Sequence, residues 1–121
     1  MNKEMRFDAM GEIGCVVCAA RGFDTPAERH HLLTTGLHGN GRRRGHHCTV
    51  AICAYHHRGE SAGSGLAELF NLGPNYADHA REFRKEWPDE KLLVATNRAL
   101  REYADNTIGV TYEQLGCEVI G

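Results

Sequence analysis

The stretch ICAYHHRGE, residues 52–60, places a cysteine, two adjacent histidines and an arginine within nine residues. A second histidine pair stands upstream in ERHHLL, residues 28–33. The β-branched and apolar CTVAIC, residues 48–53, predicts a strand that leads directly into the first stretch. Because histidine and cysteine are common ligands of transition-metal ions, this arrangement favours metal chemistry at the junction of a strand and a helix.

A CxxC pair, CVVC at residues 15–18, precedes the histidines. Two thiolates at this spacing grip one side of a zinc ion, and a closed structural site needs four ligands. The CxxH spacing at residues 53–56 supplies a second pair. The leading ligand set is Cys15, Cys18, Cys53 and His56. Cys48 is an alternative member, but strand alternation would place it on the opposite face from Cys53.

The chain has five cysteines, so at least one has another role, and we leave the remote Cys117 as a structural or free thiol. The alternatives for CVVC are buried free thiols or a redox pair. A redox pair is expected at a helix N-terminus beside a parallel strand, and no strand–helix–strand pattern surrounds it. Five cysteines with eight histidines in a reducing compartment favour metal ligation over disulfides.

Glycines at 36, 39, 41 and 45 predict a loop between the two strands. The expected order is strand, loop, strand and helix, at residues 27–33, 34–47, 48–53 and 54–59. Further along, apolar residues at helical spacing predict two packing helices. These helices are expected at 76–87 and 89–104. We read residues 1–14 as a leader segment and expect one strand in the tail, 107–121.

The 121 residues carry 14 Lys and Arg against 16 Asp and Glu, a net charge of −2. Residues 1–60 have eight basic and six acidic side chains, whereas residues 61–121 have six and ten. The basic excess therefore lies with the His and Cys cluster, where a nucleic acid would be held by local charge. No apolar stretch is long enough for a membrane helix, and the N-terminus lacks a signal-peptide core, so we expect a cytoplasmic protein.

Within each histidine pair, we expect the two side chains to lie in different sites. Neighbours on a helix diverge by about 100°, so His57 points away from His56. On a strand, His30 and His31 point to opposite faces or are splayed by local twist. His30 and His57 can then share one ion, which leaves His31 free to act on water.

With these residues, the chain resembles the HNH endonucleases of the ββα-metal fold. The resemblance covers about residues 13–60, through CVVC, ERHHLL, the glycine-rich GLHGNGRRRG, CTVAIC and CAYHH. The later REFRKEWPDEKLL, residues 81–93, is similar to the phage-type recombination-enhancement nucleases, which act with a recombinase filament. The resemblance implies an α+β fold with a small ββα-metal core, a structural zinc and a helical C-terminal extension, 61–121, within one nuclease domain, 1–121.

The resemblance also implies roles for individual residues. His30 and His57 match the ligands of a catalytic divalent ion, Mg²⁺ or another, and His31 matches the general base. Cys15, Cys18, Cys53 and His56 match the structural Zn²⁺ site. For the family's middle residue, often Asn, this chain offers His46, His47 or Cys48, of which we favour the two histidines without deciding between them. Hydrolysis of a DNA phosphodiester would leave a 5′-phosphate and a 3′-hydroxyl, as in the family.

Arginines near these histidines are candidates for DNA binding. Arg42, Arg43 and Arg44 lie between glycines whose freedom lets guanidinium groups reach phosphates. Arg58 follows His57 directly and either touches the scissile phosphate or is a plain surface side chain. Glu28 is either an exposed side chain or the hydrogen-bond partner that orients a ligand histidine.

The main alternative function is a catalytically silent zinc module that binds nucleic acid or protein. Such a module would keep the four zinc ligands and would have no need of His31. The extra histidine pair beside a basic loop favours the enzyme. A thiol oxidoreductase is disfavoured by the missing strand–helix–strand pattern, and a toxin-type nuclease by the lack of a visible secretion signal or partner domain.

Overall fold

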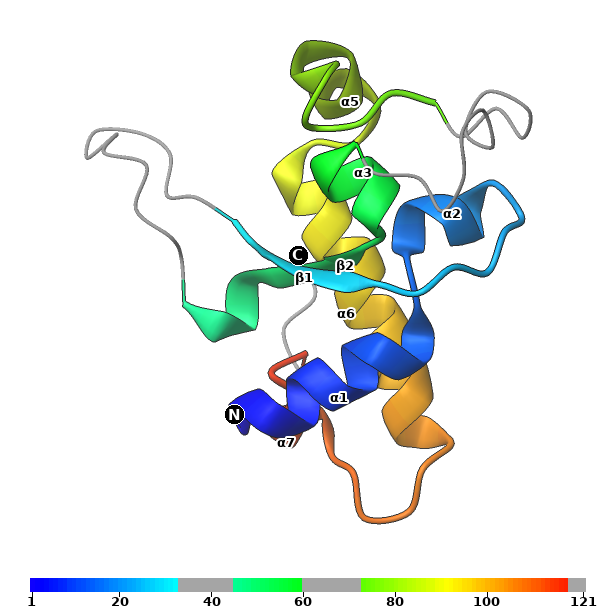
Figure 1. The fold of residues 1–121 in the computed structure, drawn as a ribbon. Helices are drawn as coiled ribbons and strands as arrows, with labels where there is room; N and C mark the ends of the chain where they lie inside the picture. Colours follow the sequence, from blue (N-terminus) through cyan, green and yellow to red (C-terminus); the bar gives the residue numbers. More distant parts are fainter. Residues whose placement is uncertain (33–44, 60–72, 118–121) are drawn as a thin grey trace.

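A computed structural model describes residues 1–32, 45–59 and 73–117 of the chain. At its centre, two short antiparallel strands cross in front of a long helix (Figure 1). Strand β1, Glu28–His31, pairs with β2, Thr49–Ile52, so that His31 lies opposite Thr49 and Glu28 opposite Ile52. Both predicted strands are confirmed, with bounds shorter than the apolar pattern indicated.

Helix α3, Ala54–Arg58, follows β2 after a single residue, Cys53, which is its N-cap. The helix ends at Gly59, whose φ of +79° closes it in the left-handed region that glycine adopts without strain. The helix predicted for 54–59 is therefore confirmed. Strand, strand and helix place the histidines of β1 and α3 on adjacent elements.

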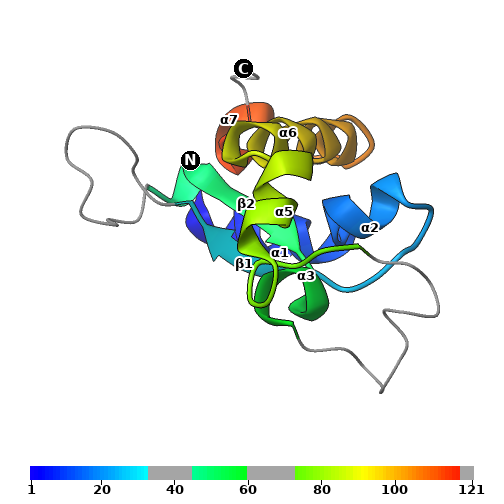
Figure 2. The same cartoon turned by 90° about the horizontal axis from the view of Figure 1, so that it is seen from above.

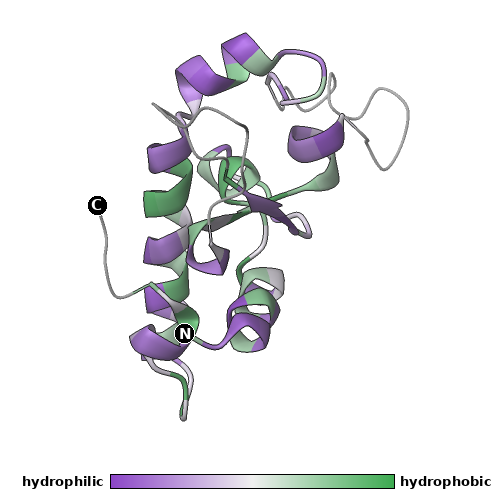
Figure 3. Ribbon diagram, turned by 90° about the vertical axis from the view of Figure 1, so that its left-hand side faces the viewer, coloured by the Kyte–Doolittle hydropathy of each residue, from purple (hydrophilic) through white to green (hydrophobic). Residues whose placement is uncertain are grey.

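Helix α6, Asp89–Asp105, covers the sheet and confirms the helix predicted for 89–104. All four residues of β2 are buried, and the helix turns Leu92, Thr96 and Leu100 into the same core. Figure 2 shows α6 on one side of the strands, and Figure 3 shows hydrophilic β1 beside the more hydrophobic β2. Because β2 is covered and β1 is only half-buried, the side chains of the sheet that reach solvent lie on β1.

The prediction of a leader segment at the N-terminus was wrong. Residues Lys3–Ile13 form helix α1, which packs against α6 and both strands. Its buried residues, Arg6, Ala9 and Met10, have helical spacing, but a charged residue among them hides the apolar pattern. Asn2 caps the helix by accepting a hydrogen bond from the backbone N–H of Met5 at 3.1 Å.

Arg6 explains how a charge fits inside this core. It is fully buried, and its guanidinium donates to the Thr49 hydroxyl at 2.8 Å, to the Thr49 carbonyl at 2.7 Å and to the Leu115 carbonyl at 2.8 Å. Burial lowers the pKa of Arg6 to about 10, so the side chain stays protonated at neutral pH. Arg6 thereby joins α1, β2 and the C-terminal part of the chain.

Four shorter elements complete the described part of the chain. They are α2, Val16–Ala20; the 3₁₀ turn η1, His46–Cys48; α5, Ala80–Glu86; and α7, Tyr112–Leu115. The strand expected in the tail is wrong within 107–117, where α7 forms with a capping box between Thr111 and Gln114. The helix predicted for 76–87 begins only at Ala80. No helix in the described ranges has the length and apolar character to cross a bilayer.

Candidate metal centres and active site

The side chains of the CxxC pair and the CxxH pair come together next to the junction of β2 and α3. Cys15 is the N-cap of α2 and accepts a hydrogen bond from the backbone N–H of Cys18 at 3.4 Å. Cys53 is the N-cap of α3, and His56 lies one turn into that helix. The four side chains are buried, and their ligand atoms all lie within 4.8 Å of one another.

The spacing of these atoms fits a tetrahedral ion. With zinc bonds of about 2.3 Å to sulfur and 2.1 Å to nitrogen, two sulfurs lie about 3.8 Å apart and a sulfur and a nitrogen about 3.6 Å apart. The Sγ atoms of Cys18 and Cys53 are separated by 3.7 Å. His56 Nδ1 lies 3.7 Å from Cys15 Sγ, 3.5 Å from Cys18 Sγ and 3.2 Å from Cys53 Sγ. This Cys₃His cluster could hold a zinc ion.

The close contacts among the three thiols change the pKa values of two of them. Hydrogen bonds with Cys15 and Cys18 lower the pKa of Cys53, whereas hydrogen bonds with Cys15 and Cys53 raise the pKa of Cys18. Three thiolates this close repel one another unless a cation neutralises them. Cys48, the alternative ligand, is buried at the end of η1 and is not part of the cluster.

A second constellation lies on the outer side of the same junction. His57 Nδ1 is 3.0 Å from a Glu28 carboxylate oxygen, and His57 Nε2 is 3.2 Å from His30 Nδ1. Hydrogen bonds from Arg58 lower the pKa of Glu28, and His57 adds to this effect, so Glu28 is an ionised acceptor at neutral pH. The carboxylate therefore accepts a hydrogen bond from His57 Nδ1–H, which turns Nε2 of the ring toward His30.

The gap between these two nitrogens fits one shared cation. Two nitrogens bound at about 2.1 Å to an ion, at angles between 90° and 109°, lie about 3.0–3.4 Å apart. The observed 3.2 Å falls in that range. The Tyr76 ring packs against His30, with centroids 5.0 Å apart, and the Tyr76 hydroxyl donates to Asp89 at 2.9 Å. Residues before α5 and at the start of α6 thus hold the His30 ring in place.

His31 points to the other face of β1, as strand alternation predicts. Its Nε2 lies 3.0 Å from His46 Nδ1. Both imidazole rings meet the Phe7 ring of α1 edge-on, with centroid distances of 6.1 Å for His31 and 5.7 Å for His46. His47, the other candidate for the middle position, instead lies beside Gly45 and Gly116.

The predicted DNA-binding arginines fall into two groups. Arg42, Arg43 and Arg44 lie outside the described residues. Arg58 forms a bidentate ion pair with Glu28, with Nε 2.9 Å from one carboxylate oxygen and the terminal nitrogen close to the other. Its contact with DNA stays a prediction.

Sequence reasoning missed Phe7, Tyr76 and Arg29. Phe7 lies in a segment that we did not expect to be helical, and Tyr76 lies in a segment expected only to form a packing helix. The alternation of β1 offered a signal for Arg29, because residues two apart share a face. Arg29 therefore shares the face of His31, and its guanidinium carbon lies 4.5 Å from the centre of the Phe7 ring.

The fold and its clusters define a small mixed α/β protein with a two-stranded sheet and a Cys₃His site. The family model for recombination enhancement, RecA-dependent nuclease matches residues 2–101, and the chain belongs to this family. The family description indicates a nuclease, an enzyme that acts on DNA, with a role in recombination that depends on RecA. Neither the curated proteins nor the solved structures contain a match.

Proposed function

We propose that the protein is an HNH-type, metal-dependent endonuclease that hydrolyses DNA phosphodiester bonds during recombination. The whole chain, 1–121, would act as one cytoplasmic nuclease domain on DNA, together with a recombinase filament. The observation that carries this proposal is the junction of β1 and α3, where Glu28 orients His57 toward His30. The order of two antiparallel strands and a helix around that junction supports an HNH ββα-metal core.

We assign the catalytic divalent ion to His30 Nδ1 and His57 Nε2. When bound, this ion supplies positive charge that offsets the phosphate charge and stabilises the departing 3′-oxygen. Mg²⁺ is one candidate, but imidazole nitrogens favour borderline-soft ions over Mg²⁺. We therefore expect Mn²⁺, Co²⁺ or Ni²⁺ to support at least as much activity as Mg²⁺.

We assign the general base to His31 and the middle HNH position to His46. When His31 Nε2–H donates to His46 Nδ1, the lone pair of the neutral His31 ring lies on Nδ1. His31 Nδ1 would then take a proton from a water molecule while the oxygen of that water bonds to phosphorus. The bond between phosphorus and the 3′-oxygen breaks in the same step. The products would be a 5′-phosphate and a 3′-hydroxyl.

The Cys₃His cluster serves as the structural part of this proposal. Zinc held by Cys15, Cys18, Cys53 and His56 would fix the start of α3, and with it the position of His57. A silent zinc module needs only this cluster. The second set of histidines, with its carboxylate orienter, favours the enzyme.

Plasmid nicking tests the proposal. Supercoiled plasmid is incubated with wild-type protein or His31→Ala, with and without Mg²⁺ or Mn²⁺, and in the presence and absence of RecA filaments. We expect nicking by the wild type only with a divalent ion, and at least a hundredfold less by His31→Ala. Equal nicking by both proteins would point to a contaminant, and no nicking under any condition would favour the silent module.

A further inference from the structure

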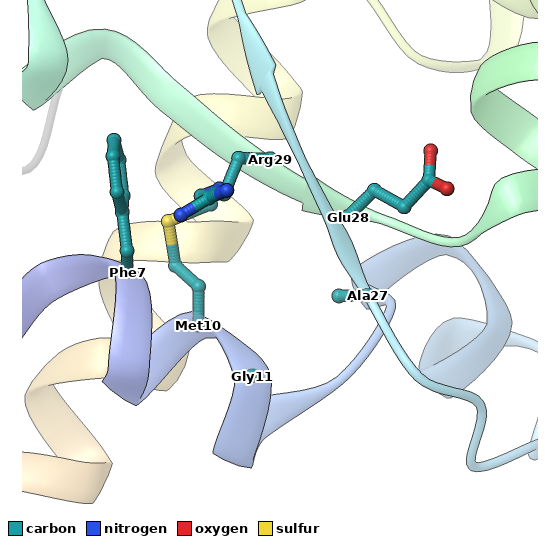
Figure 4. Close-up of a pocket in the computed structure, with 6 residues that line it drawn as sticks. All are labelled: Phe7, Met10, Gly11, Ala27, Glu28 and Arg29. Atoms are coloured by element: carbon teal, nitrogen blue, oxygen red, sulfur yellow. The ribbon is translucent and has the colours of Figure 1, made fainter.

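A groove between α1 and β1 lies on the His31 face of the sheet. It has a volume of about 490 Å³ and is lined by Phe7, Met10, Gly11, Ala27, Glu28 and Arg29. In Figure 4 the side chains of Phe7, Met10 and Arg29 gather on one side of β1, and that of Glu28 points to the other. Glu28 is among the residues that line the groove, but its carboxylate points away from the Arg29 guanidinium.

Three of the other arginines are held by acceptors within the protein. Arg58 is bound by Glu28, Arg21 donates to Glu86 at 2.6 Å, and Arg6 is buried among carbonyls. Arg29 is exposed, and in the described ranges it forms no ion pair with a carboxylate. Its main contact there is the face of Phe7, so the donors at the guanidinium edge stay available for an anion.

Phe7 places this guanidinium in a fixed relation to the His31–His46 pair. Arg29 lies over the face of the ring, and both imidazoles meet the same ring edge-on. Stacking limits the rotamers of Arg29, which reduces the entropy lost when it binds a ligand. Residues two apart on a strand are separated by about 7 Å, so an anion at Arg29 would lie next to His31.

We propose that Arg29, held on Phe7, binds a backbone phosphate of DNA beside the phosphodiester attacked through His31. This inference rests on the proposed function and extends it, since it adds a substrate-binding residue on the face of β1 that carries His31. Arg29 grips a phosphate and therefore affects substrate binding and its salt dependence.

The test measures DNA binding without cleavage. Fluorescence anisotropy of a labelled 20-nucleotide single strand and the matching duplex is recorded with zinc-loaded His31→Ala protein over a range of KCl concentrations. Adding Arg29→Gln is expected to weaken binding about tenfold and to reduce the slope of log Kd against log salt by about 0.7 for the single strand or 0.9 for the duplex. Arg98→Gln, an exposed arginine of α6, is the matched control and should leave both quantities unchanged.

Phe7→Leu separates positioning from charge. It removes the stacking surface but keeps the guanidinium, so we expect weaker binding with an unchanged salt slope. Zinc content and thermal unfolding of each variant establish that the fold is intact. A salt slope unaffected by Arg29→Gln, or no binding to either DNA form at low salt, would overturn the inference. If Arg29→Gln reduces the salt slope as expected but the wild-type protein never nicks DNA, the result would support the phosphate contact and reject the proposed nuclease mechanism.

Discussion

Glu28 connects the Arg58 guanidinium to the His57 imidazole at the junction of β1 and α3. It accepts from His57 Nδ1 at 3.0 Å and forms a bidentate pair with Arg58. A carboxylate on the far nitrogen of a ligand histidine fixes the ring and strengthens its metal binding. In the proposed site, Glu28 therefore acts through His57 as a positioning residue.

Replacing Glu28 with Gln removes the charge and leaves a side chain of similar shape. We expect the apparent Kd of the catalytic ion to rise about ten- to a hundredfold, with a smaller change in the rate at saturating ion. Plasmid nicking titrated with Mn²⁺ measures both values. Glu82→Gln, on the exposed face of α5, serves as the control. An unchanged Mn²⁺ dependence in Glu28→Gln would contradict the orienting role.

A second residue-scale prediction concerns His46. His46→Asn keeps an acceptor in reach of His31, whereas His46→Ala removes it. We expect His46→Ala to lower the nicking rate about a hundredfold and His46→Asn to lower it less. His47→Ala should retain wild-type activity, because His47 lies toward Gly45 and Gly116. The middle position would belong to His47 if the two alanine variants behaved in the opposite way.

At the scale of elements, the Cys₃His cluster joins the start of α2 to the start of α3. Zinc binding at such a cluster is coupled to folding, because the ligands come from segments far apart in the chain. We expect about one zinc per chain, measured by mass spectrometry of metals after dialysis. Removal by a strong chelator should lower Tm by roughly 10 °C or more.

Cys15→Ser should reproduce the effect of the chelator. Cys117→Ala is the matched control, because Cys117 is buried outside the cluster and should not change the zinc content. A Cys15→Ser protein with full zinc content and unchanged Tm would show that the ion, if present, binds elsewhere.

The sequence predicted those elements whose pattern is local. The spacing of the CxxC and CxxH pairs predicted the Cys₃His cluster, and strand alternation predicted different faces for His30 and His31. Helix α1 was not predicted because Arg6 occupies a core position. The acceptors of Arg6 on β2 and α7 are visible only in the folded chain. Helix α7 had a local signal, the capping box of TYEQ, which we did not use.

Side-chain pairing across the fold could not be predicted in the same way. The partner of Arg58 is Glu28, thirty residues earlier, and either side chain alone is a plausible surface residue. The contact of His31 with His46 depends on how the chain returns after the predicted glycine-rich loop. The composition of these segments restricts the candidates, but only the tertiary arrangement selects among them.

For the molecule as a whole, Arg6 is the contact that joins the N-terminal helix, the sheet and α7. Replacement by Met would leave the carbonyls of Thr49 and Leu115 without their buried donor. We expect a loss of about 3 kcal/mol in the free energy of unfolding, measured by urea denaturation. Lys3→Met, at an exposed position of the same helix, is the control. A change below about 0.5 kcal/mol in the Arg6 variant would mean that these hydrogen bonds contribute little.

The most direct test of the whole account is to locate its two ions. Crystals of zinc-loaded protein soaked in Mn²⁺ allow each metal to be identified by anomalous scattering at its own absorption edge. We predict zinc among Cys15, Cys18, Cys53 and His56, and manganese between His30 Nδ1 and His57 Nε2. Manganese bound elsewhere, or His30 and His57 turned away from each other in a crystal that contains Mn²⁺, would contradict the proposed active site.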